Sequence, residues 1–228
     1  MNTHASCPIC ASPRQERLSP MSRSPDAASI VRCISCRYIY RTSRLEPPAA
    51  PVPPGERIPE AIWRQQLAAI EQTVGRGRLL NIGCGDSTFI RMACASGWTV
   101  ADLDPCGGAH IELPPNITVR TSLQEGNWPA GNFDAVTLWD GLEYDANPAQ
   151  KVELAAHYCR MDGVLALKSL NGEQVNRHTV TTAQVPARLY TPAALERFLG
   201  RYGFRTERIL PLPGDHTTAL AVFARYVP

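Results

Sequence analysis

The chain has 228 residues, of which 44% are hydrophobic and 19% are charged. This is the composition of an ordinary globular protein, so it excludes a largely disordered chain, and the length allows one well-buried domain with a small additional module. The formal net charge is +2, but residues 1–46 carry seven arginines against three acids and are mildly basic. Seven arginines are too few to predict a nucleic-acid-binding surface, so we interpret them as a solvated face.

The sequence shows neither a signal-peptide core nor a membrane span. The first thirty residues contain four prolines and no continuous apolar stretch, whereas a signal peptide needs an apolar core of roughly 7–15 residues. No later run approaches the ~20 apolar residues of a membrane-spanning helix. We therefore expect a cytoplasmic protein with no membrane partner.

Four of the eight cysteines form two pairs with the spacing of metal ligands. They are Cys7, Cys10, Cys33 and Cys36, and each C-x2-C turn presents two thiolates together. Two such turns complete a tetrahedral shell, so the sequence predicts one structural Zn²⁺ with no open position for a substrate. In a segment with so few aliphatic residues the metal would supply on the order of 10 kcal/mol of folding free energy. The remaining cysteines are expected to be small buried residues: Cys84, Cys94, Cys106 and Cys159.

This zinc-ribbon-like module is expected to span residues 1–46. Ala11 and Arg37 directly follow the two cysteine pairs, at positions where glycine would relieve a left-handed backbone, which predicts positive φ at both. Residues 47–59 are rich in proline, so we expect an extended linker there. Residues 60–228 then form the main domain.

Hydrophobic periodicity and turn signals predict alternating helices and strands in the main domain. The predicted helices cover residues 63–74, 87–96, 148–161 and 192–202, with Asn147 and Thr191 as N-caps of the last two. The predicted strands cover residues 79–82, 98–103, 117–120, 133–139, 164–168, 204–210 and 218–226. This order predicts an α/β fold: a Rossmann-like, doubly wound, mostly parallel sheet of seven strands that ends in a β-hairpin, plus the small N-terminal zinc ribbon.

Residues suited to ligand binding follow the first four predicted strands. They are Gly83 and Gly85 after the first strand, Asp104 at the end of the second, Ser122 and Leu123 after the third, and Asp140 after the fourth. The carboxyl ends of parallel strands meet at one edge, where glycines let a ligand approach the backbone and an acid can accept two ribose hydroxyls. The pattern favours an adenosine-type cofactor and predicts an enzyme. A helix cap is the other interpretation of Asp104.

At these positions the chain resembles the class I S-adenosylmethionine-dependent methyltransferases, in particular a bacterial group with an N-terminal zinc module. The resemblance covers roughly residues 60–210, and it is carried by LLNIGCGDSTF, GWTVADLDP, FDAVTLWDGLEYDANP, MDGVLALKSLN and YTPAALERFLGRYGF. CPIC and VRCISCRYIY resemble the zinc module. The resemblance implies that the glycine turn surrounds the methionine part of the cofactor, that Asp104 binds the ribose, and that residues after strands three and four surround the adenine.

The resemblance implies a cofactor site made of Asn81, Gly83, Cys84, Gly85, Leu103, Asp104, Ser122, Leu123, Trp139 and Asp140. Trp139 is either a wall of this pocket or a core aromatic residue. The chain departs from the family pattern at Asn81 and Ser122, where acids are usual, and at Ser87 and Tyr144, where glycine and histidine are usual. The loss of two carboxylates predicts a modest affinity for the cofactor.

Methyl transfer demands little of side chains, because the sulfonium is already activated and the enzyme has mainly to align the acceptor and exclude water. A hydroxyl acceptor does need a general base. The candidate catalytic residues are Tyr144, His178 and His216, each with a surface or packing role as its alternative.

The function that we expect is methyl transfer to a small-molecule acceptor such as a sugar, a polyketide or another secondary metabolite. An RNA methyltransferase that holds nucleic acid with its zinc module is one alternative. The small number of positive charges and the lack of a face on which aromatic and basic residues alternate argue against it. A non-catalytic cofactor-binding protein is another. A nicotinamide dehydrogenase is disfavoured, because Thr88 stands where its fingerprint needs glycine.

Overall fold

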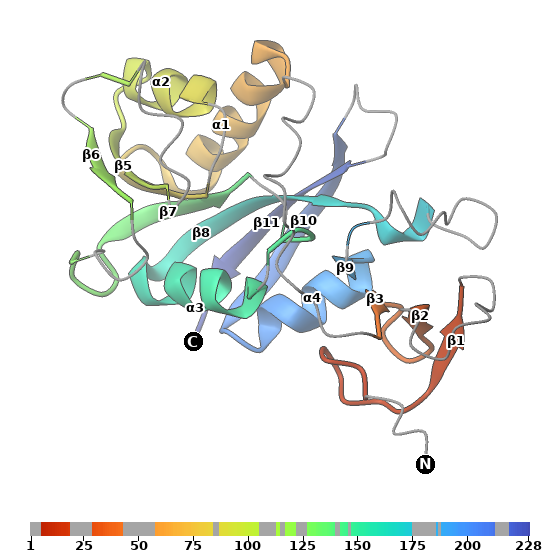
Figure 1. The fold of residues 1–228 in the computed structure, drawn as a ribbon. Coiled ribbons are helices and arrows are strands. Elements are labelled where there is room, and N and C mark those ends of the chain that lie inside the picture. Colours follow the sequence, from red (N-terminus) through yellow and green to blue (C-terminus); the bar gives the residue numbers. More distant parts are fainter. Residues whose placement is uncertain are drawn as a thin grey trace.

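The computed structural model describes residues 6–18, 29–42, 58–83, 87–104, 113–114, 117–121, 127–139, 142–145, 147–174, 186, 188–212 and 219–228. These parts of the chain form a large sheet that carries helices on both faces and a small sheet near the N-terminus (Figure 1). The expected α/β architecture is thereby confirmed.

The large sheet has seven strands in the order β10-β11-β8-β7-β4-β5-β6. Their bounds are β4 (Arg78–Ile82), β5 (Thr99–Leu103), β6 (Thr118–Arg120), β7 (Phe133–Leu138), β8 (Cys159–Leu170), β10 (Phe204–Leu212) and β11 (Ala219–Tyr226). Strands β6, β5, β4, β7 and β8 pair in parallel, and β11 pairs antiparallel with β8 and β10. The chain runs from β4 outward to β6 and then returns to β7 on the other side of β4. The strand order therefore reverses between β4 and β7, which is where ligands bind in such sheets.

Alternate residues of the strands face opposite sides of the sheet, and each side is covered by two helices. Helices α1 (Glu60–Val74) and α2 (Ser87–Ala95) pack on one face against a cluster that includes Leu79, Ala135 and Phe223. Helices α3 (Pro148–Tyr158) and α4 (Pro192–Gly200) cover the other face. Figure 1 shows the two pairs above and below the sheet.

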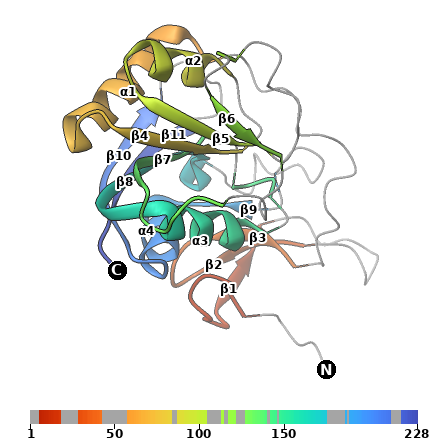
Figure 2. The ribbon, with the colours of Figure 1, turned by 90° about the vertical axis from the view of Figure 1, so that its left-hand side faces the viewer.

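The small sheet joins the N-terminal segment to the main domain. Its order is β1 (Gln15–Arg17), β2 (Ile30–Cys33), β3 (Ile39–Arg41) and β9 (Arg188–Leu189), all antiparallel. Figures 1 and 2 both place β9 beside β3. Strand β9 belongs to residues 171–190, where the sequence shows no interpretable pattern. The N-terminal sheet is thus completed by a strand from far along the chain.

Most expected elements are confirmed to within one or two residues, but the end of α3 is not. The helix expected to reach residue 161 ends at Tyr158, and β8 begins at Cys159. Cys159 is buried and pairs with Phe133 of β7, and Arg160 forms an ion pair with Asp134 at 2.6 Å. Pairing with β7 therefore overrides the local helical preference. A short 3₁₀ helix, Gly172–Gln174, follows β8.

The two capping signals have different outcomes. Thr191 caps α4, since its hydroxyl accepts a hydrogen bond from the Ala194 amide at 3.3 Å. Asn147 occupies the N-cap position of α3, but its side chain makes no capping bond. Its own amide instead donates to the Asp145 carboxylate at 2.8 Å.

The sequence also predicts buried positions for the four remaining cysteines, an extended linker over residues 47–59 and no membrane span. Cys159 is buried as expected, whereas Cys94 is partly exposed. Cys84, Cys106 and most of the proline-rich stretch 47–59 lie outside the described residues. None of the described helices combines the length and the apolar character needed to cross a membrane.

Candidate functional site

The first feature of the site is the glycine turn at the end of β4. Gly83 has φ of 137°, a backbone conformation that favours glycine, and its amide donates to the Leu103 carbonyl at 3.0 Å. This bond ties the end of β4 to the end of β5. The turn therefore lies at the carboxyl edge, beside the point where the strand order reverses.

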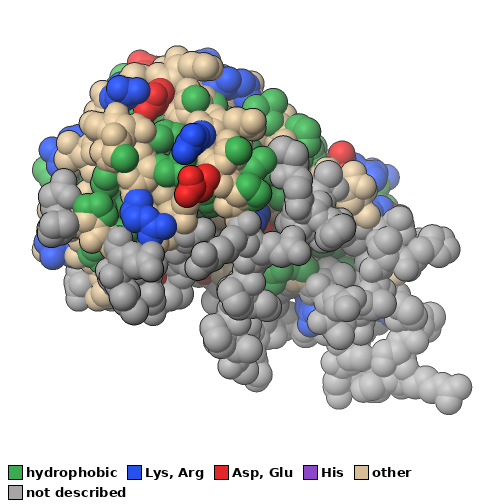
Figure 3. Space-filling model, turned by 90° about the horizontal axis from the view of Figure 1, so that it is seen from above, with side chains coloured by type: hydrophobic (Ala, Val, Ile, Leu, Met, Phe, Trp, Pro, Cys, Tyr) green, Lys and Arg blue, Asp and Glu red, His purple; other side chains and the backbone are tan. Residues whose placement is uncertain are grey.

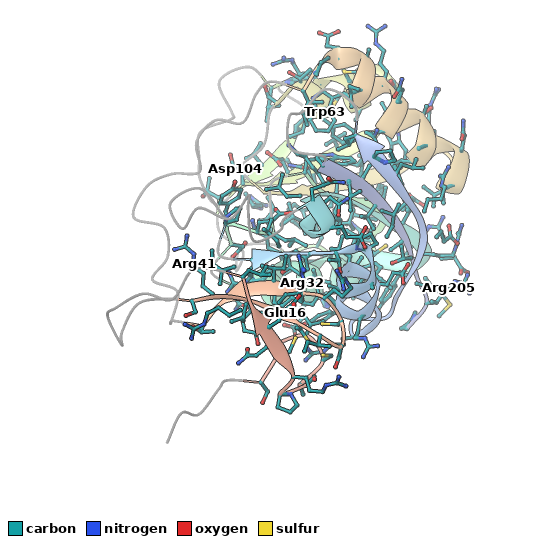
Figure 4. The ribbon with its side chains drawn as sticks, turned by 90° about the vertical axis from the view of Figure 1, so that its right-hand side faces the viewer. Glu16, Arg32, Arg41, Trp63, Asp104 and Arg205 are labelled. Atoms are coloured by element: carbon teal, nitrogen blue, oxygen red, sulfur yellow. The ribbon has the colours of Figure 1, made fainter. Side chains whose placement is uncertain are left out.

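Asp104 lies next to this turn, directly after β5. Its side chain is buried, with 1% exposed, and its amide donates to the Arg120 carbonyl of β6 at 2.8 Å. Figure 4 shows Asp104 far from Arg205, which lies near the start of β10 at the opposite edge of the sheet. The structure thus brings together Gly83, Leu103 and Asp104 at one edge.

Asn81 forms a polar bridge inside the sheet. Its amide nitrogen donates to Asp102 of β5 at 2.8 Å, and its amide oxygen accepts from Thr137 of β7 at 2.8 Å. All three side chains are buried. An aspartate at position 81 would place a second carboxyl against Asp102, which like-charge repulsion disfavours. This packing explains the departure from the family pattern, and a role of Asn81 toward the cofactor stays a prediction.

An aromatic cluster lies on the α1–α2 side of this edge. Trp139, just after β7, packs against Trp63 and Phe89 with ring centroids 5.2 and 5.1 Å away. No described residue accepts a hydrogen bond from the buried indole nitrogens of Trp63 and Trp139. Trp63 begins the helix that the sequence predicts over residues 63–74, but no motif in the sequence relates it to the site. Helix α1 ends shortly before β4 begins, so its last turn lies at the amino end of β4 and its first turn, with Trp63, lies at the carboxyl edge. This chain direction is the signal that could have placed Trp63 near the site.

The segment after β7 contains a buried acid that sequence analysis missed. Glu143 is 1% exposed, and one carboxylate oxygen accepts from the Ser169 hydroxyl at 2.6 Å and from the Leu170 amide at 2.5 Å. Burial raises the pKa of Glu143. Tyr144, a candidate base, is half-buried beside it. Nothing in the sequence distinguishes Glu143 from an exposed loop acid.

The other predicted site residues fall outside the described residues. They are Cys84, Gly85, Ser122, Leu123, Asp140, His178 and His216.

The four cysteines of the N-terminal segment lie close together. Their Sγ atoms are all within 4.8 Å of one another, with 3.6 Å between Cys7 and Cys36 and 3.5 Å between Cys10 and Cys33. A disulfide needs about 2.05 Å between its sulfurs, whereas four ligands at about 2.3 Å from a tetrahedral zinc lie about 3.8 Å apart. The geometry fits a metal better than two disulfides.

The backbone of the cysteine group agrees with this fit. Ala11 and Arg37 have φ of 57° and 62°, which confirms the expected left-handed turns. A hydrogen bond from Cys36 lowers the pKa of Cys7 to about 5, while burial raises the pKa of Cys10. A cation at the centre would let all four sulfurs carry charge.

The fold and the edge together define a class of protein. A parallel sheet closed by an antiparallel strand, with a glycine turn and an acid at the switch point, is the architecture of nucleotide-type cofactor enzymes. The family model of the methyltransferase domain matches residues 55–209, more than half of the chain. The chain belongs to this family, and it is an S-adenosylmethionine-dependent methyltransferase. No curated protein is similar enough in sequence to count as a relative.

Solved structures share the fold at low sequence identity. The Burkholderia thailandensis 1,6-didemethyltoxoflavin-N1-methyltransferase, bound to 1,6-didemethyltoxoflavin and S-adenosylhomocysteine, has a TM-score of 0.56 and 14% identity over 92% of this chain and 100% of its own. The Bradyrhizobium japonicum N-methyltransferase NodS in complex with S-adenosylhomocysteine has a TM-score of 0.58 and 14% identity over 75% of this chain and 89% of its own. The [4+2]-cyclase SpnF has a TM-score of 0.58 and 13% identity over 74% of this chain and 82% of its own. Such likeness shows the fold, and the reaction has to be argued from the site.

Proposed function

We propose that this enzyme transfers a methyl group from S-adenosylmethionine to a small molecule bound at the carboxyl edge of the large sheet. The observation that carries the proposal is that Gly83 and Asp104 lie together at the ends of β4 and β5, beside the point where the strand order reverses. Asp104 would accept the ribose hydroxyls, and the turn at residues 83–85 would lie against the amino-acid part of the cofactor. The cofactor supplies an activated methyl group, and the chain binds it, orients it and excludes water.

The rest of the cofactor site follows the same edge. Ser122, Leu123 and Asp140 would surround the adenine, and Leu103 and Trp139 would line the cofactor pocket. If the acceptor is a hydroxyl, Tyr144, His178 or His216 would accept its proton. Tyr144 is supported by its position in the segment that follows β7, at the same edge as Trp139.

We also propose that the N-terminal segment 1–46 is a zinc module, joined through residues 47–59 to the main domain 60–228. The sulfur geometry supports a tetrahedral Zn²⁺ held by Cys7, Cys10, Cys33 and Cys36. Four thiolates leave no site for substrate, so the metal would be structural.

A small acceptor is preferred to RNA because positive charge is not concentrated among the described residues on the α1–α2 side of the molecule. Figure 3, which looks down on the α1–α2 side, shows basic and acidic side chains interspersed, with no continuous basic patch among the described residues. In the small sheet, Arg32 is paired with Glu16 at 3.0 Å. Few phosphates could be neutralised at once by such a surface. A cytoplasmic location fits this chemistry.

The test is to incubate the chain with methyl-labelled S-adenosylmethionine and a cell extract divided into small molecules and nucleic acids. We expect label in the small-molecule fraction, and much less label with an Asp104→Ala control at a subsaturating concentration of S-adenosylmethionine. Label in RNA that survives physiological salt and depends on residues 1–46 would favour the RNA methyltransferase instead. No bound S-adenosylmethionine or S-adenosylhomocysteine by mass spectrometry, and no labelled product, would overturn the proposal.

A further inference from the structure

Three contacts hold the segment Leu142–Asp145, which follows β7 at the edge of the candidate cofactor site. The Asp145 carboxylate pairs with Lys151 at 2.9 Å and accepts from the Asn147 amide at 2.8 Å. Arg188 donates from Nη1 to the main-chain oxygen of Asp145. The first two partners belong to α3 and its entry, but Arg188 belongs to β9 of the small sheet.

The same segment is anchored a second time through Glu143. Its carboxylate joins the segment to the end of β8 by accepting from Ser169 and Leu170. Leu170, whose amide donates to this carboxylate, packs against Ile39 and Leu189 of the small sheet. Tyr190, which directly follows β9, accepts from the Gly172 amide at 2.9 Å, so the end of β8 that holds Glu143 is also tied to the small sheet.

The small sheet is in turn attached to the cysteine group. Tyr38 lies two residues after Cys36, and its ring centroid is 5.0 Å from that of Tyr190. The Thr191 hydroxyl donates to the Cys36 carbonyl at 3.3 Å. On the other cysteine pair, Arg201 of the α4 C-cap donates to the Pro8 carbonyl at 3.1 Å. A continuous set of packed and hydrogen-bonded residues therefore runs from the cysteines to the segment after β7.

We propose that Arg188 is a positioning residue that couples the metal of the cysteine group to cofactor binding, by holding Leu142–Asp145 against the small sheet. The inference rests on the proposed cofactor and metal sites. A metal fixes the two cysteine turns and so the edge of β3 with which β9 pairs. When β9 is fixed, Arg188 keeps the segment after β7 ordered, and a pre-ordered segment loses less conformational entropy when the cofactor binds.

The proposal predicts a reciprocal effect that structural damage would not produce. If the metal raises the affinity for S-adenosylhomocysteine by some factor, S-adenosylhomocysteine must raise the affinity for zinc by the same factor. We expect a factor of about five to ten, within the usual range of such couplings. Competition with a chelator, with and without saturating S-adenosylhomocysteine, measures it on the full chain.

The decisive variant is Arg188→Ala, which keeps all four cysteines. It should retain one zinc per chain, bind S-adenosylhomocysteine more weakly by about the same factor as the coupling, and show a zinc affinity that no longer responds to that ligand. Arg188→Lys, which keeps a donor, should restore part of the coupling. Arg32→Ala is the matched control, because Arg32 lies in the same sheet but pairs with Glu16.

Each other outcome would count against the inference. Equal zinc affinity with and without S-adenosylhomocysteine in the wild-type chain would overturn it while leaving the proposed function intact, provided that the ligand binds. Loss of coupling in Arg32→Ala as well as in Arg188→Ala would show a general effect of the sheet and would also overturn it. No binding of S-adenosylhomocysteine at all would overturn the proposed function together with the inference.

Discussion

Asp104 offers the sharpest test of the cofactor site. The perturbation is Asp104→Ala, which removes a buried carboxylate and leaves the backbone hydrogen bond from residue 104 to Arg120 available. A hydrogen bond to a charged acceptor contributes about 1.5–3 kcal/mol. The variant should therefore bind S-adenosylhomocysteine about 10- to 150-fold more weakly. Isothermal titration calorimetry measures this affinity directly. Asp104→Asn keeps the size of the side chain but loses the charge, so its affinity should lie between those of the wild type and Asp104→Ala.

The matched control is Asp134→Asn. Asp134 is also an acid of the large sheet, but it lies near the start of β7 and accepts from the Arg78 amide at 2.8 Å and from Arg160. Its loss should lower stability and leave cofactor affinity unchanged. Circular dichroism should show that both variants are folded. Wild-type affinity in folded Asp104→Ala would refute the placement of the ribose at this acid.

Three further predictions concern the metal, the pH dependence and the core. Metal analysis should find about one zinc per chain, and a disulfide between the cysteine turns would contradict this. Burial opposes ionisation of Asp134, but hydrogen bonds from Arg78 and Arg160 outweigh it and lower the pKa. The stability that ionised Asp134 contributes should therefore be complete at pH values above the ordinary aspartate pKa of about 3.9, and it should be lost as the pH falls through the lower pKa of the folded state. The free energy of unfolding in urea should consequently depend less on pH in this range for Asp134→Asn than for the wild type. Trp63→Ala should lower the free energy of unfolding by about 3–5 kcal/mol, and Trp63→Phe by much less; a loss below about 1 kcal/mol in Trp63→Ala would show that the aromatic cluster is loosely packed.

Local chemistry accounts for most of the elements that the sequence predicts correctly. The face of α1 follows from the spacing of its apolar residues, the cap of α4 from Thr191 and Pro192, and the left-handed turns from the residues after each cysteine pair. These features depend on neighbours within a few residues. The parallel strands were recognisable for a similar reason, because short apolar runs bounded by turn signals indicate buried strands.

The sequence by itself determined the order of the four helices and of the seven strands of the large sheet, the glycine turn and acid at its edge, and the two cysteine turns, since each depends on short-range spacing. Only the tertiary structure decided that β9 completes the N-terminal sheet, that β8 begins at Cys159, and that Asn81 bridges three strands. The same holds for the burial of Glu143. These features come from pairing and hydrogen bonding between segments far apart in the chain, and their energies outweigh local preferences that, residue by residue, amount to under about 1 kcal/mol.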